Sequence, residues 1–578
     1  ATSRTRPRTS TGSFRKAEEA PITPICKRLA AAALGGALLL SAAPAAATVD
    51  DERALAAYVR ARAADSLGRS QEAASAYAAA LAASPDNGVL ATRTLSQAVA
   101  AGDRLLALKA ALALEAKGKL QPDARLLLLG EAFRTRRWKE AERQIAEIEK
   151  DDVFSFMTPL LRAWLAQGSG KGDPLALLAK SSGNALASTY AGEHRPLLLL
   201  AAGKAKEGAL ALASLLEDVS IRAQRLRIAA AAALARKGEK QAALELLRGE
   251  GEAVGEARAR LEAGKRPGLE IATPAAGLAE LVARIALDLD AQQIPQLALA
   301  FARLSTFIEP ANPEGHLIAA ELLAERDRPD EALAALARVP ASDPFAAMAA
   351  DRRVSLLVEA KRGPEALAEA REAARLQPGS IESWTRLGDV LGELDRQAEA
   401  AEAYGRALDL ARGADAPGHP LWTLWMLRGS ALTQAGRWPE GKAALEQAHK
   451  LAPDQPVVLN YLGYSQLERR ENVAAAEALI REAARLQPDN AAITDSLGWA
   501  HYVRGDLKSA VALLEQAARG LPTDPSIGEH LGDAYYAAGR RYEARYAWQA
   551  ALVYADAKAA ERLRAKIDVG LRPELAAP

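Results

Sequence analysis

The residue patterns that could support catalysis are few and incomplete. Residues 168–173, GSGKGD, resemble a phosphate-binding loop, but they lack that loop's first glycine and the Ser or Thr that follows its lysine. The six histidines are scattered, and no two are four residues apart, so the sequence holds no helical metal-binding pair. No G-x-S-x-G nucleophile motif occurs. We therefore predict no catalytic residue, no metal site and no cofactor, and we interpret GSGKGD as a loop between helices.

Composition points to a helical chain. Hydrophobic residues make up 49% of the 578 residues but aromatic residues only 5%, so Ala and Leu supply most of the apolar content. Ala and Leu favour helices, whereas strands prefer the β-branched and aromatic residues that are scarce here. The formal net charge is +1, and seven basic and two acidic residues fall within residues 1–47. The remainder is faintly acidic, which argues against nucleic acid as a partner.

The N-terminal segment has the pattern of an export signal. Lys27 and Arg28 precede the apolar run of residues 29–40, and small residues at Ala45 and Ala47 indicate cleavage before Thr48. The run is too short to span a bilayer. Cys26 lies ahead of the apolar run, whereas a lipid-bearing cysteine would follow it. We therefore expect an exported chain, periplasmic or in the cell envelope, with no transmembrane segment after cleavage.

A spacing of about 34 residues organises nearly all of the rest. In SQEAASAYAAALAASPDN and LKSAVALLEQAARGLPTD, a small residue is followed by a bulky one four positions later, a small one three further on, and then a proline. Positions four and three apart share one helix face, and the proline ends the helix. The first small residue recurs fourteen times, at Ala73, Ala107, Ala141, Ala176, Gly208, Ala242, Ala298, Ala332, Ala366, Ala400, Gly441, Ala476, Ala510 and Ala544.

In the later units, another series of small residues lies ahead of the second-helix series. Glycines lie twelve or thirteen residues before the second-helix residue, at Gly388, Gly429, Gly463, Gly498 and Gly532. Glycine within a helix costs about 1 kcal/mol relative to alanine, so its recurrence suggests close contact between two helices. Helix, turn and helix at this spacing, with LG and then A–Y–A in the unit of residues 384–407, resembles the tetratricopeptide repeat.

The resemblance implies an all-α chain, an α-solenoid with a right-handed superhelix of about fourteen helix-turn-helix repeats and a concave groove lined by first helices. We predict a signal and N-terminal extension over 1–47, an N-terminal array over 48–249, an irregular linker over 250–278, a C-terminal array over 279–555 and a capping helix and tail over 556–578. The linker is expected because that stretch is rich in Gly and Pro.

Family positions that face the groove give the candidate binding residues. They combine aromatic and acidic side chains and are predicted to bind a peptide: Asn460, Tyr464, Asp495, Trp499, Tyr502, Glu529, Asp533 and Tyr536. The alternative is that Trp499 and the tyrosines only pack between helices. The set of Lys and Arg residues with which some repeats hold a terminal carboxylate is absent, so we expect a neutral or basic partner.

Function follows from the family as an expectation. The segments LNYLGY, ITDSLGW and IGEHLGDA are similar to the final repeats of exported adaptors of the bacterial envelope, including a lipoprotein that recruits substrates to a protease. We predict a non-enzymatic scaffold that binds envelope proteins or peptides. Its oligomeric state is unknown. One alternative is a component of an exopolysaccharide or protein export machinery. Another, a repeat-containing transferase, would need a catalytic domain after Ala544, and few residues follow.

Overall fold

The computed structural model describes residues 49–151, 153–412 and 420–577, and the side chains from residue 52 onward. The predicted export signal, Cys26 and Thr48 lie outside these residues, as do most of the residues of the 412–420 loop. Within the described residues there are thirty α-helices, α2–α31, and no strand. These residues form two compact units, which meet in the sequence between Ala360 and Lys361. The prediction of an all-α helical repeat fold is confirmed.

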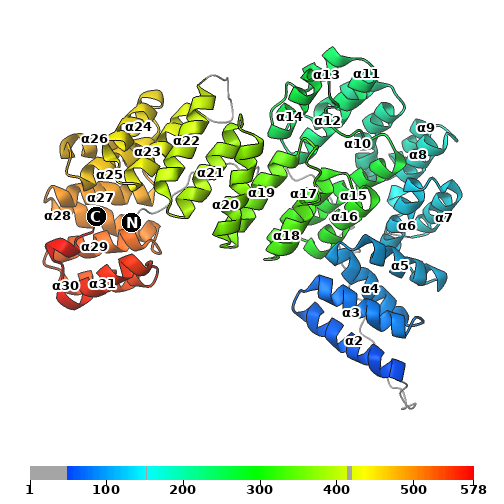
Figure 1. Ribbon diagram of the computed structural model, residues 1–578, viewed down its shortest axis with the longest axis horizontal. Helices are drawn as coiled ribbons and strands as arrows, with labels where there is room; N and C mark the ends of the chain where they lie inside the picture. The colour runs from blue at the N-terminus through cyan, green and yellow to red at the C-terminus, as the bar shows by residue number, and fades with distance from the viewer. Residues whose placement is uncertain (1–48, 152, 413–419, 578) are drawn as a thin grey trace. The chain divides into compact units, whose positions relative to one another are not determined.

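The N-terminal unit is a succession of helical hairpins (Figure 1). Its helices are α2 (Val49–Ser66), α3 (Ser70–Ala83), α4 (Gly88–Ala101), α5 (Arg104–Ala116), α6 (Pro122–Arg134), α7 (Trp138–Glu149), α8 (Thr158–Ser169), α9 (Pro174–Leu178), α10 (Ala185–Ala201), α11 (Ala205–Ala211), α12 (Ile221–Arg236), α13 (Lys240–Leu246), α14 (Glu252–Glu262), α15 (Pro274–Ala291), α16 (Pro295–Ile308), α17 (Pro313–Ala324), α18 (Pro329–Leu336) and α19 (Ala346–Glu359). Three short 3-10 helices accompany them, η1 (Ser155–Met157), η2 (Ala179–Gly183) and η3 (Ala213–Leu215).

The C-terminal unit continues the hairpin pattern. Its helices are α20 (Gly363–Leu376), α21 (Ile381–Glu393), α22 (Gln397–Ala411), α23 (Leu421–Gln434), α24 (Trp438–Leu451), α25 (Pro456–Glu468), α26 (Val473–Leu486), α27 (Ala491–Val503), α28 (Leu507–Gly520), α29 (Pro525–Ala537), α30 (Arg541–Leu552) and α31 (Ala557–Val569), followed by η4 (Pro573–Leu575). The predicted capping helix within residues 556–578 is α31.

The recurring small residues lie where two helices meet. Twelve of the fourteen are buried, and ten of these are alanines with no exposed surface. The glycines of the first helices explain the contact: a Cβ atom on Gly388 would lie 2.5 Å from the Tyr404 ring, and one on Gly532 would lie 2.3 Å from Trp548. Only a residue without a side chain fits at these two positions. The predicted close approach of paired helices is confirmed there.

Two of the fourteen positions were wrong. Ala176 is exposed and Ala242 is only half-buried, while Leu178 and Ala243 are the buried residues of those helices. Both residues lie in short second helices, α9 with five residues and α13 with seven. A helix of one or two turns presents a narrow face, so a shift of one or two residues changes which side chain meets the neighbouring helix.

Residues 250–278, expected as an irregular linker, contain a helix. α14 buries Ala253, Ala257 and Leu261, which are four residues apart and therefore share one face. The irregular stretch shrinks to the residues between α14 and α15, where the Leu269 carbonyl accepts a hydrogen bond of 2.7 Å from Nη1 of Arg225. The apolar spacing in this segment outweighs its glycine and proline content. The segment lies inside the N-terminal unit.

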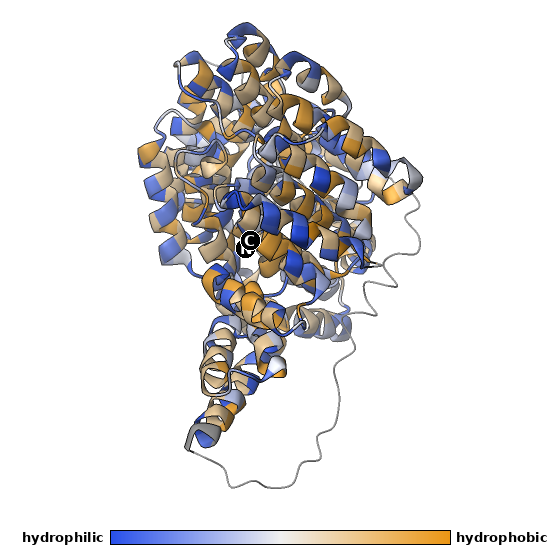
Figure 2. Cartoon of the chain, turned by 90° about the vertical axis from the view of Figure 1, so that its right-hand side faces the viewer, coloured by the Kyte–Doolittle hydropathy of each residue, from blue (hydrophilic) through white to orange (hydrophobic). Residues whose placement is uncertain are grey.

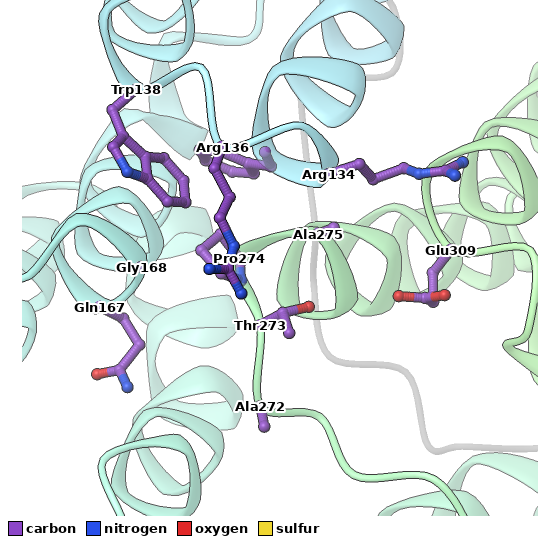
Figure 3. A pocket seen from close by; sticks show the side chains of 11 residues that line it. Arg134, Arg136, Trp138, Gln167, Gly168, Ala272, Thr273, Pro274, Ala275 and Glu309 are labelled. Carbon is purple, nitrogen blue, oxygen red and sulfur yellow. The ribbon is translucent and has the colours of Figure 1, made fainter.

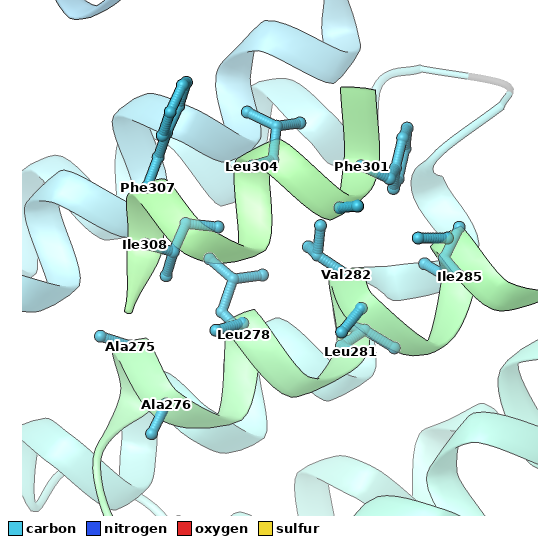
Figure 4. Close-up of a cluster of buried hydrophobic side chains, with 14 of the residues drawn as sticks. Ala275, Ala276, Leu278, Leu281, Val282, Ile285, Phe301, Leu304, Phe307 and Ile308 are labelled. Atoms are coloured by element: carbon cyan, nitrogen blue, oxygen red, sulfur yellow. The ribbon is translucent and has the colours of Figure 1, made fainter. Parts of the chain in front are cut away.

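The two units have differently organised cores. In the N-terminal unit one continuous cluster extends from α4 to α19. Figure 4 shows part of it, where Leu278 and Val282 of α15 face Leu304 and Ile308 of α16. In the C-terminal unit the buried apolar residues form several small clusters, each shared by neighbouring helices. This is the packing of a solenoid, in which each repeat contacts only its neighbours.

Helix amphipathicity is visible throughout the described residues. Figure 2 shows hydrophobic and hydrophilic residues alternating around the helices. Within the described part of the chain, no helix combines the length and the apolar character needed to cross a membrane.

The GSGKGD segment connects α8 to α9, where Asp173 accepts a hydrogen bond from the Leu175 backbone N–H and caps α9. Its predicted role as a connecting loop is confirmed.

Candidate binding face of the C-terminal unit

The eight predicted binding residues lie on three successive first helices, α25, α27 and α29, and differ in exposure. Four are half-buried: Asn460, Tyr464, Tyr502 and Tyr536. Four are buried: Asp495, Trp499, Glu529 and Asp533. The buried four hold neighbouring helices together. The peptide-binding role of the set stays a prediction, and the half-buried members are the ones that a partner could reach.

A buried aromatic and hydrogen-bonded cluster joins the three helices. His530 of α29 contacts the Asp495 carboxylate of α27 through Nδ1 at 2.9 Å. The Trp499 indole stacks on the His530 ring with centroids 4.2 Å apart and on the Tyr502 ring at 4.4 Å. The Tyr464 hydroxyl of α25 lies 3.4 Å from Nε2 of His530. The sequence did not assign His530 to this site, because Asp495 lies 35 residues earlier, on the first helix of the preceding repeat.

The electrostatics of His530 follow from these contacts. Burial lowers the pKa of the His530 imidazole, but the nearby carboxylates, chiefly that of Asp495, outweigh it and leave the pKa above its ordinary value. Although Asp, His and a hydroxyl are aligned, the hydroxyl is a phenol and the imidazole ring is covered by Trp499. Because His530 is only 3% exposed, the arrangement acts as packing between repeats and not as an accessible general base. His501, the other histidine nearby in sequence, contacts Asp506 instead, at 3.1 Å.

The capping helix neutralises two of the predicted acidic residues. Lys566 of α31 is fully buried and donates to Glu529 and Asp533 at 2.7 Å. Arg562, one turn earlier, donates two hydrogen bonds of 2.6 Å to Glu529. Burial raises the pKa of Glu529, but the two cations outweigh it, so the pKa lies below its ordinary value. The sequence contained an indication of this contact, because the acidic residues Glu529 and Asp533 are four residues apart and share one helix face. The basic residues Arg562 and Lys566 have the same spacing.

Two half-buried tyrosines complete the face. Tyr502 lies flat against Trp499, with an interplanar angle of 13°. Tyr536 packs near Trp548 at 5.7 Å, and the Arg541 guanidinium lies 5.5 Å from its ring centroid. Tyr464, Tyr502 and Tyr536 therefore form a line of aromatic side chains, one on each first helix, which we call the tyrosine face. Tyr464 and Tyr502 contact the buried cluster, and Tyr536 is held by Trp548 and Arg541.

The N-terminal unit contains a hollow of about 480 Å³ (Figure 3). It lies among the α6–α7 turn, the end of α8 and the start of α15, with Arg136, Trp138 and Thr273 on its walls. Thr273 accepts a hydrogen bond from the Ala276 N–H and so caps α15. Arg134 donates to the Phe307 carbonyl at 3.3 Å. Thr273 and Arg134 are therefore both used in the fold.

The same unit holds a buried ionic network that sequence reasoning missed. Arg222 of α12 donates to Glu280 of α15 at 2.7 Å and to Glu193 of α10 at 2.8 Å. Glu314 of α17 is 1% exposed, and its nearest cation is Arg222 at 4.0 Å. Burial, followed by the neighbouring Glu280 carboxylate, raises the pKa of Glu314 above its ordinary value. No group of three or more His, Cys, Asp or Glu suited to a metal ion occurs among the described residues.

Comparison with known proteins agrees with the repeat geometry. Residues 381–413, which span α21 and α22, match the family model described as tetratricopeptide repeat. The tetratricopeptide repeat that the sequence predicted is thus matched over these residues of the C-terminal unit. The chain is 43% identical over 58 residues to a TPR repeat-containing protein of Pseudomonas aeruginosa, an alignment that covers only 10% of each chain. Tetratricopeptide repeats form protein-interaction scaffolds and are typically non-catalytic.

Solved structures with a similar course of the chain include three helical repeat proteins. The Cut9 and Hcn1 hetero-tetramer of the APC/C matches at 15% identity over 91% of this chain and 97% of that chain, with a TM-score of 0.36. YrrB, described as a TPR protein with an unusual peptide-binding site, matches at 16% over 34% and 97%, with a TM-score of 0.25. A tetratricopeptide repeat protein from Parabacteroides merdae matches at 14% over 44% and 97%, with a TM-score of 0.35. At these TM-scores the likenesses do not bear on what the chain binds.

Proposed function

We propose that this chain is an exported, non-enzymatic adaptor of the bacterial cell envelope and that it binds a partner protein or peptide at the tyrosine face. The observation that carries the proposal is the placement of three half-buried tyrosines on three successive first helices. Tyr464 and Tyr502 contact the cluster around His530, and Tyr536 packs on Trp548. Tyrosine offers a large apolar ring with a polar tip at low conformational cost, which suits recognition of a peptide.

The envelope location rests on the pattern of residues 27–47, with a basic start, an apolar run and small residues before Thr48. The similarity of the final repeats to exported adaptors is in line with it. Recruitment of substrates to a protease, or assistance to assembly of an envelope complex, would each need only a rigid face and no reactive group. The adaptor class therefore fits the contents of the C-terminal unit.

The test compares tagged full-length chains in recovery of partners from a periplasmic fraction. Tyr502→Ala and Tyr536→Ala should each weaken a partner's binding by roughly 2 kcal/mol, about 30-fold, if they anchor it. Lys508→Ala, an exposed residue on the second helix α28, is the matched control and should leave recovery unchanged. Equal recovery by wild type and both tyrosine variants would refute the tyrosine face.

A separate measurement addresses export. N-terminal sequencing of the protein recovered from the periplasmic fraction should give a chain that begins at Thr48. Recovery of the chain only in the cytosolic fraction, with its N-terminal residues intact, would contradict the proposed location and leave the binding face to be judged by the first test.

A further inference from the structure

The second helix of the last repeat, α30, presents two large side chains to solvent. Tyr542 is 80% exposed and Tyr546 is 72% exposed. They are four residues apart, so they lie one above the other on one helix face. The inward side of the same helix is occupied by Ala544, Trp548 and Ala551, all of which are buried. The two tyrosines therefore contribute little to the packing of the repeat.

The other repeats provide an internal comparison for these positions. Tyr542 and Tyr546 lie two residues before and two residues after the small residue of α30. The equivalent residues of earlier second helices are small, charged or proline: Lys508 and Ala512 in α28, Ala474 and Ala478 in α26, Pro439 and Ala443 in α24, and Ala398 and Glu402 in α22. Helix stacking thus does not require tyrosine at either position, and the pair needs another explanation.

Charge distinguishes this helix as well. Arg541 and Arg545 are exposed beside the two tyrosines, and neither takes part in an ion pair within the described residues. The Arg541 guanidinium also lies against the Tyr536 ring, so the two faces adjoin there. The nearest acidic residue in sequence, Glu543, contacts Arg540 at 3.1 Å. The same pair, between the N-cap arginine and the glutamate three residues later, occurs at α22 and α24, so Glu543 is already used and Arg541 and Arg545 are additional cations of α30. The face formed by Arg541, Tyr542, Arg545 and Tyr546, which we call the α30 face, therefore carries uncompensated positive charge.

We propose that the α30 face is a second interaction surface, distinct from the tyrosine face, and that it binds an acidic segment of a partner protein. Arginine pairs with carboxylates through two parallel hydrogen bonds, and tyrosine rings anchor the apolar parts of a peptide. Both residue types are enriched where binding energy concentrates in interfaces. A protein segment is favoured over a membrane because the exposed face carries polar hydroxyls and the neighbouring Glu543 and Gln549, and its aliphatic part is limited to Val553 at the end of the helix, whereas a helix that lies in a membrane surface has a continuous apolar face.

The test places a photo-crosslinking amino acid at Tyr546 of the full chain in living cells, with Ala512 of α28 as the matched control position. The proposal expects a crosslink from Tyr546 and not from Ala512, to a segment of another protein in which acidic residues outnumber basic ones. A crosslink to lipid, to a second copy of this chain or to a basic segment would overturn it, as would no crosslink at Tyr546.

The crosslinked segment, made as a synthetic peptide, then provides the quantitative step. Its affinity for the full chain should fall at least about tenfold in the Tyr542→Ala, Tyr546→Ala double variant and in the Arg541→Gln, Arg545→Gln double variant. Lys508→Ala should leave the affinity unchanged. Tyr502→Ala on the tyrosine face should leave it unchanged as well, so failure of either surface can be recognised separately. Equal affinity in all five proteins would overturn the α30 face.

Discussion

The close contact between α29 and α30 gives a sharp test of the packing. An alanine at Gly532 would place its Cβ atom 2.3 Å from Cδ1 and Nε1 of Trp548, where ordinary contacts begin at about 3.4 Å. Trp548 is fully buried, and its Nε1 donates to Asp533 at 2.9 Å. The Trp548 ring would have to move by roughly 1 Å. The ring is rigid and fully buried, so this movement would disturb the residues packed around it.

The magnitude follows from two opposing effects. Replacing glycine by alanine within a helix stabilises it by about 1 kcal/mol. Overpacking costs about 1–3 kcal/mol, and weakening the hydrogen bond from Trp548 to the Asp533 carboxylate adds about 1.5–3 kcal/mol. We expect Gly532→Ala to lose about 2 kcal/mol net. Gly405→Ala is the control, since its Cβ would meet only Arg428 at 3.6 Å, and it should gain up to about 1 kcal/mol.

The assay must be local, because repeat arrays do not unfold in a single two-state step. Backbone amide hydrogen exchange over residues 525–569 of the full chain should be faster in Gly532→Ala and unchanged or slower in the control. If Gly532→Ala were as stable as the wild type, the glycine would not be required for helix contact and the packing described here would be wrong.

Three further predictions concern buried charge. Lys566→Met should cost about 3–5 kcal/mol, measured by the same exchange experiment, because it leaves Asp533 buried without its cation and leaves Glu529 with Arg562 alone. The pKa of His530 is raised in the folded state, so protonated His530 stabilises the fold fully below about pH 6.5. This stability is lost as the pH rises through the folded-state pKa, and the melting temperature should fall over the same pH range. Asp495→Asn should abolish this fall, because it removes the carboxylate that chiefly raises the pKa. Glu314 also has a raised pKa, so the N-terminal unit should lose stability as the pH rises above about 4.5, and Glu314→Gln should be more stable than wild type at pH 8 by about 2 kcal/mol in urea unfolding.

The parts of the fold that could be predicted from sequence are those set by local spacing. The fourteen small residues mark the second helices, and the glycines from Gly388 onward mark the first helices, because both positions face another helix at close range. Errors arose where this geometry weakens. Ala176 and Ala242 lie in helices too short to fix a register, and α14 was missed because glycine and proline content hid a face of residues four apart.

The candidate site was less predictable because its side chains are completed by residues distant in sequence. Family positions indicated Glu529 and Asp533, but whether a carboxylate reaches solvent depends on α31, which lies more than thirty residues away and supplies Lys566. His530 was overlooked because its partner Asp495 belongs to the preceding repeat. The buried network around Arg222 joins three helices between residues 193 and 280, a contact that no local pattern reveals.

Neutralisation of the acidic residues changes what the C-terminal unit can recognise. The expectation of a neutral or basic partner was drawn from a groove with aromatic and acidic positions and no Lys and Arg set, and two of the acidic residues, Glu529 and Asp533, are paired with Lys566. The tyrosine face is then selective through shape and apolar contact, whereas the α30 face adds positive charge.

If the two faces bind separate partners, the effects of substitutions on the two faces must be independent. For each partner, the double variant Tyr502→Ala, Tyr546→Ala should bind with the same affinity as the single variant on that partner's own face, within about 0.5 kcal/mol. Titration calorimetry with each partner alone measures this. A larger coupling would mean that one ligand spans both faces, and the two surfaces would then have to be treated as a single site.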